Sequence, residues 1–163
     1  MFRKMRRFVQ ELPQEEVEQI LIEATSGVLA VQGDDGYPYA VPVSFVYHDG
    51  NIYIHSAVSG HKVDAMADCD KVSFCIIGQD IISSKERTSY YKSVIAFGRV
   101  RKLTDPKEKR EVGIFIGEKY SKDNREEYLE ELDRMSSLMN CYEIQIEHIT
   151  GKESMHLTRQ RNR

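Results

Sequence analysis

The sequence predicts a mainly β protein in which an antiparallel sheet or barrel carries helices at its periphery. Six segments have the composition of strands, and the early ones are joined by hairpin-type turns. Apart from a short helix expected after Gly60, helical periodicity appears near the start and between the last two strands, unlike the strand–helix alternation of a doubly wound parallel sheet. The 163 residues are predicted to form one domain, 1–163, with 1–12 and 157–163 as tails.

The first helix is predicted to begin at Gln14 and to end at Ala24. Apolar residues recur between these positions at helical spacing, Pro13 stands at the start, and Gly27 follows the end. Acidic residues in the first turn interact favourably with the helix dipole.

Two strands are expected next, at 28–32 and 37–47, on either side of a tight turn of glycine and aspartate. Pro38 and Pro42 lie within the second strand and cannot donate hydrogen bonds to a ladder. We therefore expect this strand at an edge of the sheet or at a break in pairing, where backbone groups stay free for a ligand.

Three further strands are expected before residue 104. The segment 51–55 alternates isoleucine with other residues, so its two sets of side chains must face opposite sides. Strands are also expected at 71–77 and at 90–103. Residues 78–89 show no periodicity and are expected to form a loop.

Two helices and one more strand complete the prediction. Asp105 followed by Pro106 and Glu108 is typical of a helix start. A second amphipathic helix is expected around Tyr128. A half-buried strand is expected at 141–149, because apolar and polar residues alternate there.

Charge and cysteine content limit the functional classes. The formal net charge is −3, from 23 basic and 26 acidic residues, so no overall field favours nucleic acid. No apolar run approaches the length of about 18 residues that a membrane-spanning helix needs. Cys69, Cys75 and Cys141 lack C-x-x-C spacing, which indicates thiols in a reducing compartment. We expect a cytoplasmic protein without nucleic-acid or membrane partners.

The stretch from Ile52 to Lys62 carries the clearest sign of a binding site. The predicted strand ends in His55 and small residues and passes through Gly60 into a helix. The first turn of that helix offers backbone N–H groups together with His61 and Lys62. Unpaired amides, a helix dipole and two basic side chains suit a phosphate. A plain loop with a surface lysine is the alternative at this point.

Other chemistries are less well supported. His48, His55 and His61 fall within fourteen positions, but their spacing matches no helical ligand pair, so no metal site is predicted. The sequence has no G-x-S-x-G nucleophile elbow, no P-loop and no G-x-G-x-x-G fingerprint. A hydrolase or a Rossmann enzyme is therefore unsupported.

Four segments carry further information when they are taken in chain order. They are GYPYAVPVSF at 36–45, IHSAVSGHK at 54–62, YKSVIAFG at 91–98 and ITGKE at 149–153. Together they resemble the nitroimidazole-resistance proteins, which are flavin-binding split β-barrels similar to pyridoxamine 5′-phosphate oxidase. The resemblance extends over roughly residues 15 to 156, nearly the whole chain.

This resemblance implies a homodimer of six-stranded split barrels with a flavin, usually FMN and with FAD possible, in each of two clefts at the dimer interface. The residues that match cofactor-binding positions are Val41, Pro42, Val43, Ser44, His55, Ser56, Ala57, His61, Lys62, Tyr91, Ser93, Val94 and Lys152. By this match, residues 41–44 run beside the flavin ring, 61–62 bind its phosphate, and 91–94 close the cleft from the same or the partner subunit. Lys152 is either a phosphate contact or a turn residue.

The implied activity is that of an FMN-dependent oxidoreductase. NAD(P)H would donate a hydride to the flavin, and a small acceptor such as a nitroimidazole would receive the electrons. His55 is the predicted catalytic residue, because a pKa near neutrality would let it donate a proton to the reduced nitro group or hydrogen-bond to the acceptor. The alternatives are a flavin-binding or redox-sensing module without turnover, and a split barrel that binds haem or a deazaflavin.

Overall fold

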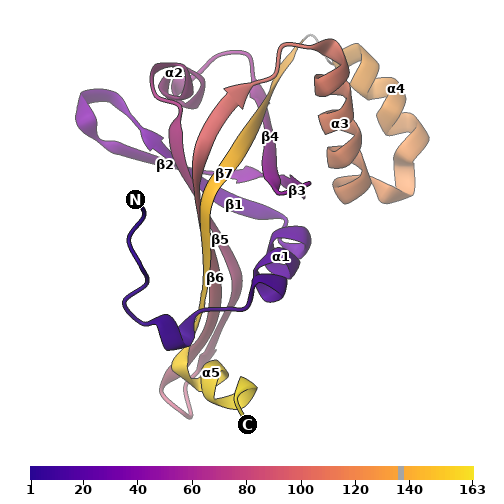
Figure 1. The fold of residues 1–163 in the computed structure, drawn as a ribbon. Helices are drawn as coiled ribbons and strands as arrows, with labels where there is room; N and C mark the ends of the chain where they lie inside the picture. The colour runs from indigo at the N-terminus through magenta and orange to yellow at the C-terminus, as the bar shows by residue number, and fades with distance from the viewer. Residues whose placement is uncertain (136–137) are drawn as a thin grey trace.

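The computed structural model describes residues 1–135 and 138–163. Its elements in chain order are η1 (Phe8–Gln10), α1 (Gln14–Glu23), β1 (Ser26–Gln32), η2 (Asp34–Gly36), β2 (Pro38–Ser44), β3 (Val46–His48), β4 (Asn51–Ala57), α2 (His61–Asp68), β5 (Lys71–Ser83), β6 (Thr88–Lys102), α3 (Pro106–Tyr120), η3 (Lys122–Asn124), α4 (Arg125–Met135), β7 (Met139–Glu153) and α5 (Met155–Arg161). The strands form one antiparallel sheet in the order β2-β1-β5-β6-β7-β4-β3 (Figure 1). The predicted class, mainly β with peripheral helices, is confirmed.

The sheet has seven strands rather than the predicted six, because the run 37–47 is interrupted at Phe45. The Phe45 side chain is fully buried between β2 and β3. The hydroxyl of Tyr120, at the end of α3, accepts a hydrogen bond from the Phe45 N–H at 3.1 Å and lies 2.8 Å from the Phe45 carbonyl oxygen. β2 and β3 are the two edges of the sheet, so one continuous stretch of sequence supplies both edges. Of the two alternatives expected for the strand with Pro38 and Pro42, an edge position or a break in pairing, the structure shows the edge position, because β2 pairs with β1 without interruption through both prolines.

The core lies on one side of the curved sheet, where α1 and α2 cover it. Residues directly opposite in antiparallel strands share a face. One row of opposite residues crosses five strands on the side away from the core, and it consists of Pro42, Val28, Cys75, Ile95 and Thr150. We call this side, with the residues two positions before and after each member, the outer face.

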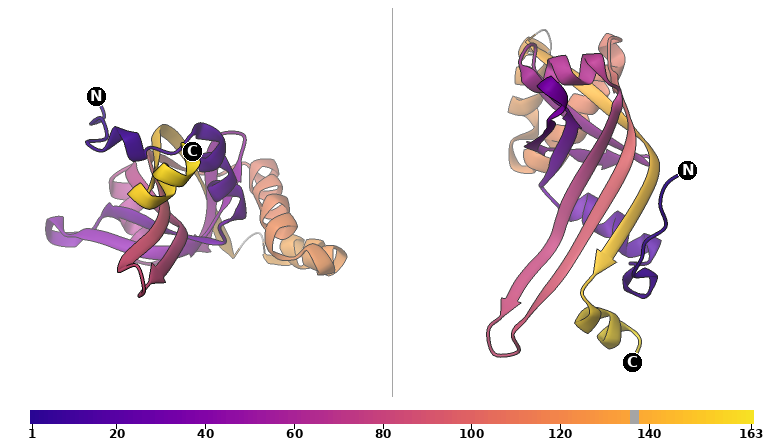
Figure 2. Two further views of the ribbon diagram at one scale, coloured as in Figure 1. Left: turned by 90° about the horizontal axis from the view of Figure 1, so that it is seen from below. Right: turned by 90° about the vertical axis from the view of Figure 1, so that its left-hand side faces the viewer.

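β5 and β6 form a longer hairpin than the sequence predicts, and it projects from the rest of the sheet (Figure 2). The expected loop at 78–89 is wrong, because β5 continues to Ser83 and β6 begins at Thr88. Ile81 and Ile82, near the tip, are 58% and 77% exposed. No buried face exists in this arm, so the alternation that normally indicates a half-buried strand is missing.

Both ends of the chain pack partly against the body, so the predicted tails 1–12 and 157–163 need correction. Gln10 is buried, and its side-chain amide donates a hydrogen bond to the Glu153 carbonyl oxygen at 2.8 Å. Arg161, on α5, forms an ion pair of 2.8 Å with the buried Glu153 carboxylate. The contact of Gln10 joins residues more than a hundred positions apart, and the pair of Arg161 and Glu153 lies beyond the last predicted strand. No local sequence pattern therefore indicated either contact.

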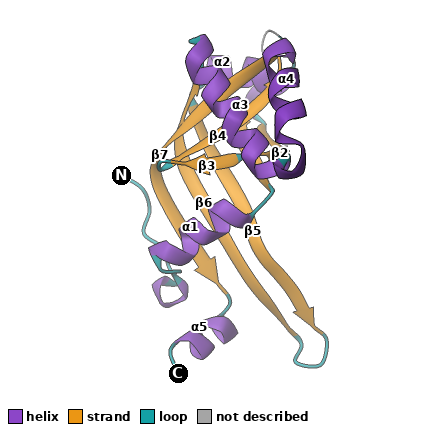
Figure 3. Ribbon diagram, turned by 90° about the vertical axis from the view of Figure 1, so that its right-hand side faces the viewer, coloured by secondary structure: helices purple, strands orange, loops and turns teal. Residues whose placement is uncertain are grey.

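α3 and α4 form a hairpin beside β3 and β4 (Figure 3). Asp105 caps α3 as predicted, because its carboxylate accepts a hydrogen bond of 2.8 Å from a first-turn amide. Gly113 and Gly117 bring α4 close, since a Cβ at these positions would overlap Leu132 and Tyr128 respectively. Over the described residues, no helix combines the length and the apolar character that crossing a membrane requires.

Candidate functional site

The turn between β4 and α2 offers hydrogen-bond donors to an anion. Gly60 precedes α2 with a φ of 128°, a conformation that favours glycine. Its carbonyl oxygen accepts hydrogen bonds from the amides of Val63 and Asp64. The amides of His61 and Lys62 come earlier in the first turn and have no acceptor within the helix.

The two basic side chains of this turn differ in their surroundings. The His61 ring stacks on Tyr39 with 4.1 Å between centroids, and its Nε2 lies 3.6 Å from an Asp34 carboxylate oxygen. Lys62 is half-buried and forms no ion pair within the part of the chain that the structure describes. Lys62 is therefore the better placed of the two to neutralise a bound anion, because His61 is held by the β1–β2 connection.

His55 lies on the side of β4 that faces the α3–α4 hairpin. The alternation along β4 buries Ile52, Ile54 and Ser56 and leaves His55 exposed, as the sequence predicts. The hydroxyl of Ser56 donates a hydrogen bond of 2.7 Å to the carbonyl oxygen of Ala57. Ala57 itself is exposed. His55 lines a partly open cavity of about 190 Å³ whose other walls come from α3, α4 and β7.

The surroundings of His55 favour its neutral form. Partial burial lowers the pKa of the imidazole from its ordinary value, and the positive charge of Lys62 lowers it further. A lowered pKa reduces the share of imidazolium that could donate a proton, whereas a neutral imidazole can still form hydrogen bonds. No group of three or more His, Cys, Asp or Glu side chains among the described residues is placed to hold a metal ion.

The predicted cofactor residues of β2 and the middle of β6 divide between the two sides of the sheet. Val41 and Val43 pack against the core, and Val94 is fully buried. Pro42 and Ser44 are exposed on the outer face. Only these last two can offer their side chains to a ligand lying on the outer face.

Tyr91, Ser93 and Lys152 lie together on the outer face at the far end of β6 and β7. Ser93 is directly opposite Lys152, and the Lys152 ammonium lies 5.5 Å from the centre of the Tyr91 ring. Ser93 and Lys152 line a cavity of about 230 Å³ together with Arg3 and His148. The basic side chains suit an anionic group.

This cluster is far from the β4–α2 turn within one chain. Lys71, just after α2, pairs with Arg99 of β6, and Tyr91 lies eight residues earlier on the same strand. At about 3.3 Å per residue, the separation along the strand is about 26 Å for Tyr91 and about 20 Å for Ser93, which lies opposite Lys152. Figure 1 shows α2 and the tip of the β5–β6 hairpin at opposite ends of the molecule. The structure therefore does not bring Lys62 and Lys152 together in one chain.

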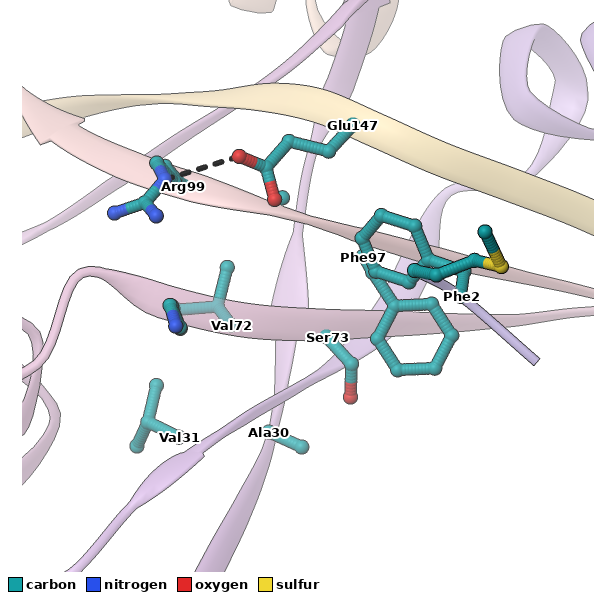
Figure 4. Close-up of a pocket in the computed structure, with 11 residues that line it drawn as sticks. Phe2, Ala30, Val31, Val72, Ser73, Phe97, Arg99 and Glu147 are labelled. Atoms are coloured by element: carbon teal, nitrogen blue, oxygen red, sulfur yellow. Dashed lines mark hydrogen bonds and ion pairs between the residues drawn. The ribbon is translucent and has the colours of Figure 1, made fainter.

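A groove of about 570 Å³ runs along the outer face between these two regions (Figure 4). Ala30 and Ser73 contribute small side chains to it, and Arg99 and Glu147 form an ion pair of 3.0 Å at one side. Phe2, at the other side, belongs to the N-terminal segment that crosses the sheet. Sequence reasoning missed this groove, although small residues at equivalent positions of two neighbouring strands are a signal that could have indicated it.

The curved, open antiparallel sheet with peripheral helices defines a protein of the split-barrel class. The chain belongs to the pyridoxamine 5′-phosphate oxidase family, because the family model of that description matches residues 13–153. A comparison with curated proteins found no match.

Three solved structures illustrate the shared fold. A candidate 5-nitroimidazole antibiotic resistance protein from Bacteroides thetaiotaomicron has a TM-score of 0.76 at 21% identity, covering 88% of this chain and 86% of its own. A conserved hypothetical protein from Mycobacterium tuberculosis has a TM-score of 0.79 at 18% identity, covering 94% and 92%. An FAD-binding protein from Mesorhizobium loti has a TM-score of 0.59 at 27% identity, covering 88% and 96%.

Proposed function

We propose that the protein binds a flavin and works as a flavin-dependent oxidoreductase. We take FMN as the cofactor, with FAD as the alternative, NAD(P)H as the electron donor and a nitroimidazole or related small molecule as the acceptor. The observation that carries the proposal is the Lys62 cation beside the free amides of the β4–α2 turn, in a member of the pyridoxamine 5′-phosphate oxidase family. The FAD-binding relative from Mesorhizobium loti supports a flavin.

The residues present fit a phosphorylated aromatic cofactor. Lys62 and the first-turn amides of α2 would hold the phosphate through charge-assisted hydrogen bonds. Pro42 and Ser44 offer an exposed, uncharged surface on which a ring can lie. When bound, a flavin supplies the hydride and electron transfer chemistry. The chain's own residues then contribute position, charge and exclusion of water.

We propose that the working unit is a homodimer. A site that uses both Lys62 and the cluster of Ser93 and Lys152 needs two chains, because about 20 Å of strand separates the two regions in one chain. Ile77 and Ile95 of the outer face are 65% and 41% exposed, which gives a second copy apolar surface to cover.

Of the two roles expected for His55, we retain the hydrogen bond to the acceptor. The lowered pKa disfavours the imidazolium form, so the proposal does not rely on proton donation by His55. A neutral imidazole has one donor and one acceptor nitrogen, and either can orient a polar group of the acceptor.

The visible spectrum of the purified protein is the first test. A two-band flavin spectrum supports the proposal, whereas a Soret band indicates haem. A featureless spectrum, together with no binding of added FMN or FAD to the protein, would reject flavin binding. Release of the chromophore by denaturation, followed by chromatography, separates FMN from FAD. Steady-state oxidation of NADH with a nitroaromatic acceptor then distinguishes an enzyme from a flavin-binding module without turnover.

Lys62→Ala tests the phosphate contact. Loss of a charge-assisted hydrogen bond is expected to weaken FMN binding by about 1–3 kcal/mol, or about 5- to 150-fold in Kd. Lys107→Ala removes an exposed lysine from the first turn of α3 and serves as the matched control. Fluorescence titration measures both, and equal affinity in the two variants would contradict the assignment of Lys62.

Mixed dimers test whether two chains share the site. Lys62→Ala and Lys152→Ala chains are each expected to bind FMN weakly as homodimers. In a mixed dimer with shared sites, one site lacks both lysines and the other has both. After random reassortment, roughly a quarter of all sites should therefore recover the wild-type affinity. No recovery, despite mixed dimers seen by native mass spectrometry, would show that each site is built within one chain.

A further inference from the structure

The cavity beside His55 is separate from the groove on the outer face. It lies between β4 and the α3–α4 hairpin and has a volume of about 190 Å³. Its lining residues are His55, Ile116, Tyr128, Glu131, Leu132 and Met139. Among these described residues, apolar or aromatic side chains form most of the wall, and His55 and Glu131 contribute ionisable groups.

Close packing between the two helices positions two of the residues that line this cavity. Gly113 lets Leu132 lie directly against the α3 backbone, and Gly117 does the same for the Tyr128 ring. The Tyr128 hydroxyl donates a hydrogen bond of 2.7 Å to the Gly113 carbonyl oxygen. These contacts draw two wall residues toward α3 and hold them there. The pairing of the helices therefore fixes the positions of Leu132 and Tyr128 in the cavity wall.

The volume and the lining limit what the cavity can hold. An apolar cavity of about 150 Å³ in another protein is large enough to bind benzene. A cavity of about 190 Å³ therefore accommodates one aromatic ring with a small substituent, and it is well below the range typical of drug-sized ligands. Lys62 lies close enough to act on the charge of His55, so the His55 end favours an electron-rich group on the ring.

We propose that this cavity binds a single aromatic or heteroaromatic ring, with an oxygen-bearing substituent hydrogen-bonded to His55 and the ring held between Ile116, Tyr128 and Leu132. Assigning that ring to the electron acceptor rests on the proposed function. Binding of the ring itself needs neither flavin nor turnover. The α3–α4 hairpin, rather than the sheet, would then set the size limit for the ring.

Phenol is the probe, and toluene is its matched partner without the hydroxyl group. In methyl-labelled wild-type protein, saturating phenol is expected to shift the methyl signals of Ile116 and Leu132. The methyls of Ile81, exposed on the β5–β6 arm, serve as the internal control. Unshifted signals for both cavity residues would overturn the proposal without any variant being made.

Substitutions separate the two parts of the proposed contact. His55→Ala is expected to weaken phenol binding about 2- to 10-fold, the value of one hydrogen bond, and to change toluene binding less than about twofold. His156→Ala, on α5, is the matched histidine control and should change neither. Equal loss of phenol and toluene in His55→Ala would contradict the hydrogen bond. Met139→Trp should fill the cavity and abolish binding of both probes, and retained binding in the folded variant would reject the location.

The outcomes for the two proposals can be told apart. Protein that binds phenol in this cavity but takes up no flavin rejects the oxidoreductase proposal and supports the ring site. Protein that carries flavin but shows no shift at Ile116 or Leu132 rejects the ring site alone.

Discussion

Tyr120→Phe removes one hydroxyl and is expected to destabilise the interruption at Phe45, where the chain passes from β2 at one edge of the sheet to β3 at the other. The Tyr120 oxygen accepts from the Phe45 N–H at 3.1 Å and lies 2.6 Å from the Thr25 carbonyl oxygen and 2.8 Å from that of Phe45. A hydroxyl has one proton, so it donates to one of the two carbonyls at a time. The substitution therefore removes two hydrogen bonds.

The expected cost follows from those two bonds. At about 1 kcal/mol for each hydrogen bond, the variant should lose about 2 kcal/mol of unfolding free energy. The variant also leaves the Phe45 N–H without an acceptor beside a fully buried side chain. Because an unsatisfied donor is costly, we expect the loss of unfolding free energy to be no smaller than this value. With a slope of about 2 kcal/mol per M in urea, the midpoint should fall by about 1 M.

Urea unfolding followed by circular dichroism measures this shift. Tyr37→Phe is the matched control, because Tyr37 is 75% exposed and no comparable contact holds it. The control should stay within about 0.5 kcal/mol of the wild type. Equal midpoints for the two variants would refute the idea that Tyr120 fixes the break. Faster hydrogen exchange at the Phe45 amide in Tyr120→Phe alone would localise the effect.

Two further perturbations probe the site and the chain ends. Because the His55 pKa is lower in the folded state, the unfolded state binds more protons as pH falls through 6.5, and stability falls with it. His55→Gln should therefore gain stability relative to the wild type on acidification from pH 8 to 5, and parallel pH profiles would disprove the shift. Arg161→Ala leaves the Glu153 carboxylate buried without its cation and should cost about 3 kcal/mol by urea unfolding, since Arg161 is itself partly exposed. Arg159→Ala, an exposed neighbour, should cost less than about 0.5 kcal/mol, and a similar loss in both variants would contradict the buried pair.

Local signals predicted those parts of the fold that depend on local physics. The helix from Gln14 has its start, its apolar stripe and its stop within a dozen residues, and α1 forms there. The alternation at 51–55 placed His55 on the face opposite Ile52 and Ile54, and β4 has that arrangement. The prolines of β2 correctly indicated an edge strand.

The features that sequence reasoning missed depend on distant residues. The break at Phe45 is held by Tyr120, seventy-five positions away, so the segment 37–47 alone looks continuous. The setting of His55 is made by residues of α3 and α4 that line its cavity, and the first of these, Ile116, follows His55 by sixty-one positions. Its pKa therefore could not be judged from its neighbours in sequence. The charge of Lys62 beside unpaired amides, in contrast, is local and was predicted.

The place of β7 in the sheet has a consequence for how the chain can fold during synthesis. β7 lies between β6 and β4 and pairs with both, so without it the strands fall into two separate pieces, β2-β1-β5-β6 and β3-β4. Residues 139–153 are the last strand to leave the ribosome. A nascent chain must keep the exposed edges of both pieces from pairing elsewhere until then. Completion of the sheet is therefore a late event, and the gap between the two pieces is where a stalled or truncated chain would be most exposed to aggregation.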